Sequence, residues 1–134
     1  MSEIQTKIPK TIHYIWLGTR PLDKVSVQCM KTWNKYLPDY EVKKWGDDEC
    51  LSLIRANKYA SQAYDAKKYA FVSDFLRVYI LYTYGGVYMD TDVQIFKPID
   101  RFLKHGAFTC FENKTQIPTA LMASAKGNKW MEAL

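Results

Sequence analysis

Apolar and polar residues alternate along the chain in two patterns, one typical of helices and one typical of strands. The longest helical pattern runs through residues 67–84, where apolar side chains recur every three or four positions. Because this segment keeps almost no polar face, we expect a buried helix. Gly85 and Gly86 end it, the first of them suited to the left-handed position that follows many helices. Residues 87–89 then predict a short strand, which leads into an acidic tripeptide.

The rest of the chain predicts alternating strands and helices. The expected elements are a buried parallel strand at 11–17, a helix from the N-cap Asp23 to Pro38, a strand at 40–45, a helix opened by Asp47 and Asp48, a loop at 57–68, strands at 107–112 and 119–123, and a final helix at 129–134. The residues expected to face the core in the first two helices are Val25, Cys29, Met30, Trp33, Leu37, Cys50, Leu51 and Ile54. Capping alone explains Asp47 and Asp48, so we expect no chemistry from them.

Two charged residues interrupt the apolar helix at 67–84. Asp74 and Arg77 lie three positions apart, so their side chains project from one side of the helix, about one turn apart. One interpretation is an ordinary surface ion pair, worth roughly 0.2–0.5 kcal/mol. The other is a place at a binding site, because buried charges are costly unless they are paired or turned toward a ligand. A helix this apolar favours the second interpretation.

Asp90 and Asp92 flank Thr91 at the end of the predicted strand. Residues two apart in an extended segment point to the same side, and two like charges so placed raise each other's pKa unless a cation separates them. Hard oxygen ligands in so small a set suit Mg²⁺ or Mn²⁺, with water and substrate phosphates completing the coordination. The alternative is an ordinary turn, in which each aspartate bonds to backbone two residues further on.

Trp16 falls at the carboxyl end of the first predicted strand, where open α/β sheets bind their ligands. Its position leaves two roles open, packing in the core and stacking on a nucleotide base. His13 lies inside the same strand. We interpret it as a core histidine with satisfied hydrogen bonds and not as a catalytic base.

Three motifs in this order resemble a known enzyme family. They are IPKTIHYIWLG at residues 8–18, SDFLR at 73–77 and YTYGGVYMDTDV at 82–93. Together they resemble the sugar-transferring glycosyltransferases that carry a DXD motif. That family includes yeast initiating mannosyltransferases, bacterial capsule and lipopolysaccharide sugar transferases and, more distantly, the glucosylating domains of large clostridial toxins. The resemblance covers nearly the whole chain and implies a GT-A-like α/β fold, a Rossmann-like mixed sheet flanked by helices.

The resemblance also implies roles for particular residues. Asp74 and Arg77 would contact the donor sugar hydroxyls as catalytic residues, and Asp92 would bind the metal ion directly. The remaining nucleotide and donor contacts would come from Ile15, Trp16, Ser73, Tyr88 and Asp90, with Trp16 stacked on the base and Asp90 bonded to the ribose or to the metal through water. Family domains continue considerably further than residue 134, so we expect the donor-binding portion of a transferase, shortened at its C-terminus.

By resemblance, the function is that of a retaining, metal-dependent glycosyltransferase. It would move a hexose from a nucleotide-diphosphate sugar, with a UDP-sugar favoured and GDP-mannose as the alternative. The acceptor would be a glycan or a lipid-linked molecule in surface polysaccharide synthesis, such as that of a capsule. No third carboxylate offers itself as a nucleophile, so we expect front-face transfer assisted by the leaving group. The alternative function is a non-catalytic fragment that binds nucleotide-sugar.

Composition narrows the number of domains and the possible classes of ligand. A length of 134 residues with 48% hydrophobic and 25% charged residues indicates one globular domain, 1–134. The net charge of +5 comes from scattered basic residues, which favours an anionic small ligand or an acidic membrane surface. We expect no nucleic-acid partner, because Asp90 and Asp92 would repel its phosphates unless a metal intervened.

Cysteine usage and the N-terminus bear on location. Cys29, Cys50 and Cys110 lie far apart, without a CxxC motif or a histidine cluster, so the sequence predicts neither a disulfide framework nor a zinc site. The first ten residues have no apolar signal region, and the most apolar run, 78–82, is too short to cross a bilayer. We therefore expect a cytoplasmic protein, peripheral at the inner membrane face if its acceptor is lipid-linked.

Overall fold

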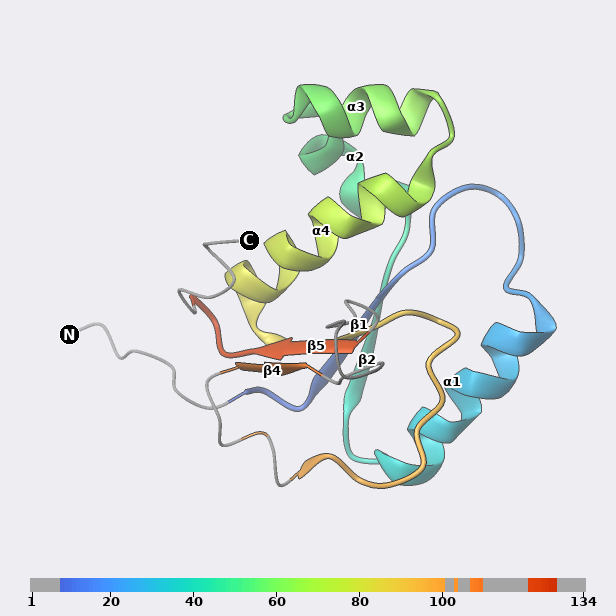
Figure 1. The fold of residues 1–134 in the computed structure, drawn as a ribbon, viewed down its shortest axis with the longest axis vertical. Coiled ribbons are helices and arrows are strands. Elements are labelled where there is room, and N and C mark those ends of the chain that lie inside the picture. The colour runs from blue at the N-terminus through green and yellow to red at the C-terminus, as the bar shows by residue number, and fades with distance from the viewer. Residues whose placement is uncertain (1–7, 101–102, 104–106, 110–120, 128–134) are drawn as a thin grey trace, which may run out of the picture.

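The computed structural model describes residues 8–100, 103, 107–109 and 121–127, and shows helices packed on both faces of one sheet (Figure 1). The elements are β1 (Thr11–Ile15), α1 (Lys24–Tyr36), β2 (Glu41–Trp45), α2 (Asp47–Arg55), α3 (Lys58–Asp65), α4 (Tyr69–Tyr84), β3 (Gly86–Met89), β4 (Ala107–Thr109) and β5 (Leu121–Ser124). This mixed α/β architecture confirms the predicted fold class. The described parts of the predicted strands at 107–112 and 119–123 match β4 and β5, whereas the predicted helix at 129–134 lies outside the described residues.

Among the described residues, five strands form one sheet in the order β2-β1-β3-β5-β4. β1 pairs in parallel with β2 and with β3, for example Ile12 with Val42 and with Val87. β5 then pairs antiparallel with β3 and with β4. The parallel half needs crossover connections, which α1 and the α2–α4 segment supply. β3 is therefore the central strand, and the sheet changes from parallel to antiparallel there.

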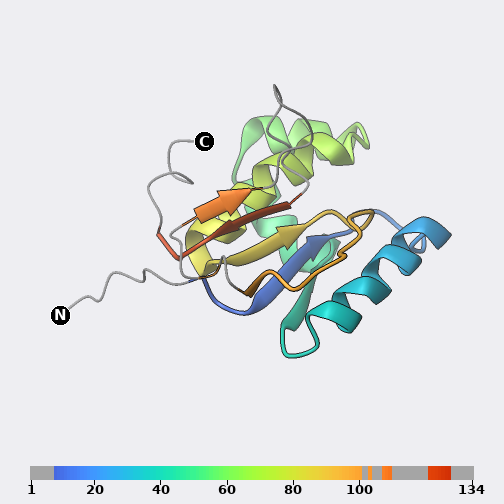
Figure 2. The same ribbon diagram turned by 60° about the horizontal axis from the view of Figure 1, so that its bottom comes forward.

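Each face of the sheet carries its own core. Val87 and Met89 of β3 pack toward α1 and the segment that follows β3, whereas Tyr88 between them packs toward α2, α3 and α4. Figures 1 and 2 show these two helical layers on opposite sides of the strands. Trp33 of α1 is 1% exposed, which places it at the centre of the first core. The second core buries one stripe of α4, formed by Val72, Leu76, Ile80 and Leu81.

The junction between α4 and β3 needs its two glycines. Gly85 has a positive φ of 72°, but it is the C-cap of α4 and its ψ of 174° is extended, so the predicted left-handed position is correct only in the sign of φ. Gly86 has φ 118°, and a Cβ there would lie 2.7 Å from the carbonyl oxygen of Thr11. Any side chain at this position would push β3 away from β1, so glycine allows the two strands to pair.

Three sequence expectations about the helices were wrong. The segment predicted as a loop at 57–68 contains α3, whose N-terminus is capped where the side chain of Asn57 accepts a hydrogen bond from the Ala60 amide. Val25 and Leu51, predicted to face the core, are 61% and 42% exposed. α4 is not buried all round, because Phe71 on its outer side is 72% exposed. Within the described residues, none of the helices has the length and apolar character needed to span a membrane.

Candidate functional site

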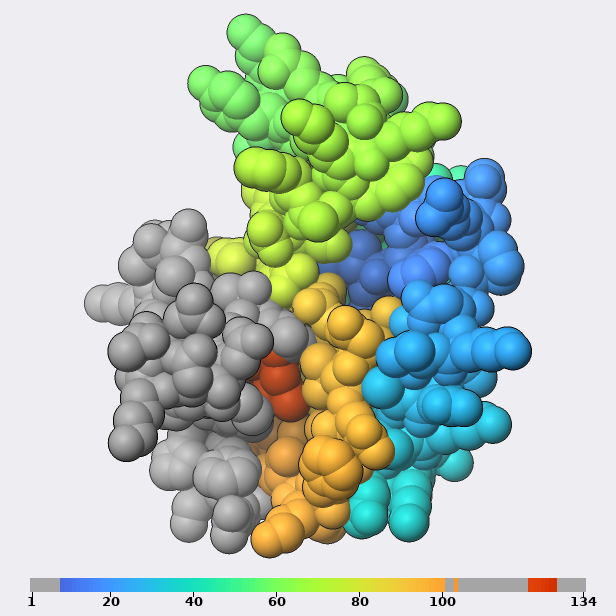
Figure 3. All heavy atoms as spheres, turned by 45° about the vertical axis from the view of Figure 1, so that its right-hand side comes forward, coloured from blue at the N-terminus to red at the C-terminus, as the bar shows by residue number. Residues whose placement is uncertain are grey.

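A cleft of about 970 Å³ opens at the carboxyl ends of β1 and β3. In Figure 3 the surface is hollowed where the green α4, the blue residues after β1 and the orange segment after β3 meet. Its size is that of a site for a small-molecule ligand. All but one of the site residues predicted from the sequence line it, namely Ile15, Trp16, Ser73, Arg77, Tyr88, Asp90 and Asp92. The exception is Asp74, whose side chain is 66% exposed.

Arg77 is a buried side chain on one wall of the cleft, at the centre of a network of charged and aromatic groups. Its side chain is only 6% exposed, and one guanidinium nitrogen lies 3.2 Å from a carboxylate oxygen of Asp74 and 3.2 Å from one of Asp90. Its Nε donates to the carbonyl oxygen of Ser73, and the guanidinium lies 4.6 Å from the centre of the Tyr88 ring. The predicted pairing of Asp74 with Arg77 is confirmed. The surface interpretation fails for Arg77, which is buried, whereas the Asp74 side chain is exposed.

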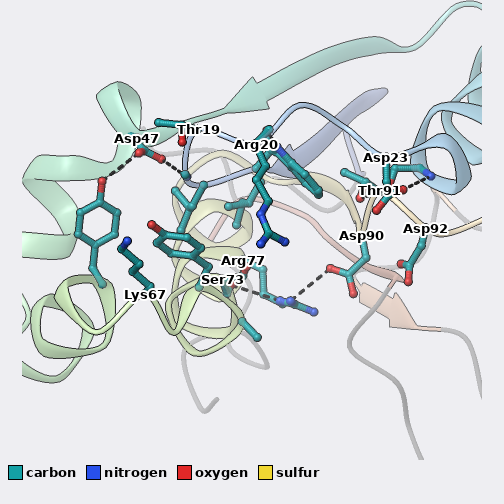
Figure 4. A pocket seen from close by; sticks show the side chains of 18 of the residues that line it. Thr19, Arg20, Asp23, Asp47, Lys67, Ser73, Arg77, Asp90, Thr91 and Asp92 are labelled. Carbon is teal, nitrogen blue, oxygen red and sulfur yellow. Dashed lines mark hydrogen bonds and ion pairs between the residues drawn. The ribbon is translucent and has the colours of Figure 1, made fainter.

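Asp90 is the less exposed of the two acidic partners of Arg77, and Figure 4 shows its contact with the guanidinium. The Tyr88 hydroxyl donates a 2.7 Å hydrogen bond to the same Asp90 oxygen that faces Arg77. Burial raises the pKa of Asp90 above its usual range, and the charges of Asp92 and Asp74 raise it further, while Tyr88 and Arg77 oppose the rise. A cation close to Asp90 and Asp92 would lower the free energy of the ionised carboxylates.

The tripeptide at 90–92 forms a turn, in which the Val93 amide donates to the Asp90 carbonyl oxygen. The backbone thus turns here, but through a main-chain bond and not through the aspartate side chains that the turn interpretation invoked. The Asp90 carboxylate, however, is held by Tyr88 and Arg77, so turn formation does not account for it. The Asp90 and Asp92 side chains both reach the cleft, as the ligand interpretation requires.

Side chains of α1 hold the turn in place. The buried hydroxyls of Ser26 and Thr91 lie 2.8 Å apart, and the Trp33 indole N–H donates to the Val93 carbonyl oxygen over 2.7 Å. Two positions further on, the Ile95 amide donates to the Thr32 hydroxyl oxygen. The segment after β3 belongs to no strand, so these bonds replace the ladder that would otherwise fix it. Sequence reasoning missed them, because no local pattern joins Ser26 to Thr91.

The opposite wall is built from the loop after β1 and from α2 and α3. Asp47 was predicted to be a cap without chemistry. It follows the N-cap Gly46, and its carboxylate bonds to groups outside α2. One of its carboxylate oxygens accepts from the Gly18 amide and the other from the Tyr64 hydroxyl, each over 2.9 Å. Asp47 thus ties the loop after β1 to α3 and lines the cleft, which corrects the capping interpretation.

Trp16 and His13 of the first strand region have different environments. Trp16 is half-buried at the cleft, and its indole N–H donates to the Arg20 carbonyl oxygen. Base stacking on Trp16 stays a prediction.

His13 is 2% exposed and accepts at Nδ1 from the Trp45 indole, so its Nε2 carries the proton and donates to the Gly85 carbonyl oxygen. Burial lowers its pKa, and the predicted core role is confirmed.

Two cations of the cleft were not predicted from the sequence. Arg20 follows the strand β1, and Lys67 lies in the turn between α3 and α4. In the view of Figure 4, Arg20 lies between Lys67 and the two aspartates, Asp90 and Asp92. Single basic residues in polar segments give no signal in a sequence, and only the fold brings these two to one cavity.

The carboxylates of the cleft form a sparse set of metal ligands. In the described part of the chain, no group of three or more His, Cys, Asp or Glu residues lies close enough to hold a metal ion. Asp90 and Asp92 supply only hard oxygen atoms. A hard divalent cation with several coordination positions left for water and ligand oxygens fits this set, whereas a cage built from protein ligands alone does not.

Comparison with known proteins identifies the family. Residues 23–109 match the family described as "Glycosyltransferase sugar-binding region containing DXD motif". The chain belongs to this family. A solved structure of a PaToxG glycosyltransferase superposes with a TM-score of 0.72 at 23% identity, covering 96% of this chain and 58% of that chain. The protein therefore has a GT-A-like glycosyltransferase fold.

Two curated relatives are mannosyltransferases. Inositol phosphoceramide mannosyltransferase 3 of Schizosaccharomyces pombe is 30% identical over 130 residues, which cover 92% of this chain and 35% of that protein. The initiation-specific alpha-1,6-mannosyltransferase of Candida albicans is 32% identical over 107 residues, 72% of this chain and 27% of that protein. The chain thus spans about a third of the length of these relatives.

Proposed function

We propose that this protein is a metal-dependent, retaining glycosyltransferase whose cleft binds a nucleotide-diphosphate sugar and transfers its hexose to a glycan or lipid-linked acceptor. The observation that carries the proposal is the network of buried Arg77 and Tyr88 with the partly buried Asp90 beside Asp92, at the end of the central strand. The names of the relatives support mannose as the hexose. GDP-mannose is therefore tested beside the UDP-sugars that we expect from the sequence.

Asp90 and Asp92 would hold the divalent metal ion, Mn²⁺ or Mg²⁺. Such an ion, when bound, neutralises the charge that develops on the departing diphosphate. The chain's own contribution is to orient the pair. Tyr88 and Arg77 fix the Asp90 carboxylate, and the bond between Ser26 and Thr91 fixes the turn between the two aspartates.

In the proposed transfer, the bond between the anomeric carbon and the diphosphate oxygen breaks, and its electron pair leaves with the diphosphate. The acceptor hydroxyl oxygen bonds to the anomeric carbon on the same face, and its proton passes to the departing diphosphate. Arg77 and Asp74 would hold the sugar hydroxyls during this step, and the planar guanidinium suits such directed contacts. The role of Asp74 requires a ligand that extends past the cleft toward the outer side of α4, because Asp74 does not line the cleft.

A second candidate function is donor binding without transfer. The roles proposed above all concern the donor, and the chain covers 35% of the first relative and 27% of the second. This candidate shares the donor site with the first. It differs only in the outcome of a transfer assay with a sugar acceptor.

Calorimetric titration of GDP-mannose and UDP-glucose, each with and without Mn²⁺, tests the donor site. The parent protein should bind at least one of them more tightly with Mn²⁺. Asp92→Asn should lose about tenfold or more of this metal-dependent gain and still fold, because it removes an anionic ligand at nearly constant size. Asp39→Asn removes the same charge from an exposed residue that does not line the cleft, and should bind like the parent.

Two results would contradict the proposal. One is equal metal-dependent binding by Asp92→Asn and the parent, which would show that Asp92 is no metal ligand. The other is the absence of binding of either nucleotide-sugar to the parent protein under all conditions.

A further inference from the structure

Lys67 occupies a backbone position that usually belongs to glycine. At the end of α3, the Lys68 amide donates to the carbonyl oxygen of Ala63 and the Lys67 amide to that of Tyr64. With Ala66 as the C-cap, these two bonds form a Schellman motif, in which the residue after the cap is left-handed. Lys67 has φ 59°. Within the described part of the chain, it is the one non-glycine residue with a positive φ.

This conformation disfavours lysine. A side chain with a Cβ in the left-handed region crowds the backbone, and the lysine side chain is too long for the local hydrogen bonds that help asparagine and aspartate there. Such backbone outliers persist where the surrounding structure enforces them, and they cluster at ligand sites. Lys67 lies at the cleft, which gives the outlier a candidate purpose.

The charge of Lys67 is also available to a ligand. Among the described residues that line the cleft, Arg77 is held by carboxylates, whereas Lys67 and Arg20 make no ion pair with another described residue. The nearby acid of this wall, Asp47, already accepts hydrogen bonds at both carboxylate oxygens. An anionic group in the cleft would therefore be the partner of these two cations.

The position of Lys67 relative to the acidic residues suggests which anion it binds. Figure 4 shows Lys67 on one side of the cleft and Asp90 and Asp92 on the other. Without a metal ion the two carboxylates repel a diphosphate, and Asp23, which also lines the cleft, adds to the repulsion. Among the described residues that line the cleft, the cations not paired with carboxylates are Lys67, on the opposite side, and Arg20, between the two sides, so we assign to them the attraction that does not depend on a metal.

We propose that Lys67, together with Arg20, binds the phosphate groups of the nucleotide without the help of a metal ion. The left-handed backbone at residue 67 is then the structural cost of placing an ammonium group in the cleft. This proposal rests on the proposed function, since it assumes that the ligand is a nucleotide-sugar. It assigns the cleft two separable contributions to affinity, one from the cations and one from the metal that Asp90 and Asp92 would hold.

Two substitutions remove the charge of Lys67 and keep its left-handed backbone conformation. Lys67→Gly and Lys67→Asn both suit the left-handed position and both lack the charge. Each should bind GDP or UDP about tenfold more weakly than the parent in EDTA, the loss expected for one charged contact to phosphate. The gain in affinity on adding Mn²⁺ should remain, and the melting temperature should stay equal or rise. The matched control is Lys68→Gln, which removes the same charge one residue away from a side chain that does not line the cleft.

Calorimetry with GDP, UDP and the two nucleosides, together with melting curves, tests whether Lys67 binds the phosphate groups. The nucleosides lack phosphate, so their affinities should not change. The proposal is wrong if Lys67→Gly and Lys67→Asn bind the diphosphates like the parent, or lose no more affinity than Lys68→Gln. It is also wrong if the nucleosides lose as much affinity as the diphosphates, or if Lys67→Gly melts at a lower temperature. Failure of the proposed function looks different, because the parent itself then binds neither diphosphate.

Discussion

Arg77 and Lys67 bring positive charges to the same cleft, but the chain holds them by different means. Arg77 is fixed by its side chain, which is 6% exposed and contacts two carboxylates, a carbonyl oxygen and the Tyr88 ring. Lys67 is fixed by its backbone, in the left-handed turn between α3 and α4, while its side chain has no ion-pair partner among the described residues. The charge of Arg77 is part of the packed interior, and the charge of Lys67 lies at the cleft.

This difference separates stability from ligand binding. Removing Arg77 leaves a partly buried Asp90 without its counter-charge, so the fold must lose stability along with any ligand contact. Removing Lys67 takes away a charge that no other described residue uses, so the fold should lose nothing. A cation held by side chains is pre-organised but cannot be changed freely, whereas one held by the backbone can be tuned without harm to the core.

The largest effect that we expect comes from Arg77→Met, which keeps the apolar stem and removes the charge. It should lower the free energy of unfolding by about 2–3 kcal/mol, somewhat less than for a fully buried pair because the Asp90 side chain is 34% exposed. Urea denaturation measures the change. The control is Arg55→Met, whose partner Asp65 is 65% exposed, and which should cost less than about 1 kcal/mol. Equal losses in the two variants would show that the network around Arg77 is no more important than a surface pair.

The second prediction concerns the pH dependence of that loss. The pKa of Asp90 is raised above its usual value of 3.8 by burial, and Arg77 restrains the rise, so it should rise further in Arg77→Met. A carboxyl group whose pKa is higher in the folded state contributes stability at low pH, and this is lost as pH rises through the folded value. The cost of Arg77→Met should therefore be greatest near neutral pH and shrink toward about pH 4.

Urea denaturation of the parent and Arg77→Met in metal-free buffer, at several pH values, tests this dependence. The matched control is the double variant Arg77→Met with Asp90→Asn, which should lose much less of its stability with rising pH, because residue 90 no longer titrates. A cost of Arg77→Met that is the same at every pH would show that Asp90 is not the group that depends on Arg77.

The smallest of these effects should follow from Thr91→Val. The substitution removes the hydroxyl partner of Ser26, which is 2% exposed, and should lower the free energy of unfolding by about 1 kcal/mol. It should also weaken Mn²⁺-dependent nucleotide binding, because the turn between Asp90 and Asp92 loses one of its ties to α1. Thr91→Ser keeps a hydroxyl and should restore both properties. If Thr91→Ser binds as weakly as Thr91→Val, the methyl group and not the hydrogen bond positions the turn.

The sequence predicted the parts of this molecule whose signals are local. The strands β1, β2 and β3 and the helix α1 lie within about two residues of their expected bounds, because β-branched runs, an N-cap and Pro38 mark them. Arg77 was found because a charge inside an apolar helix contrasts with its surroundings. Asp90 and Asp92 were found because acidic residues at the end of a strand in an α/β fold lie where ligands bind.

The features that were missed depend on contacts between distant segments. α3 was taken for a loop because its buried stripe consists of alanines and Tyr64, which look polar or neutral in sequence. The outer aromatic residues of α4 were expected inside, since apolar side chains on both sides of a helix leave no period to show which side is buried. Asp47 was assigned to capping because the local rule sufficed, although its carboxylate bonds to Gly18 and Tyr64.

The position of β3 at the centre of the sheet has a consequence for how the protein folds. Its two partners are β1, near the start of the described chain, and β5, the last strand in it, so neither pairing is local. Closing such long loops costs entropy before any contact forms, which makes this kind of sheet slow to assemble. During synthesis β3 leaves the ribosome before β5, and one of its edges has no partner until β5 arrives. The strand that leads into Asp90 and Asp92 is therefore made before β5 but gains its second partner only when β5 arrives.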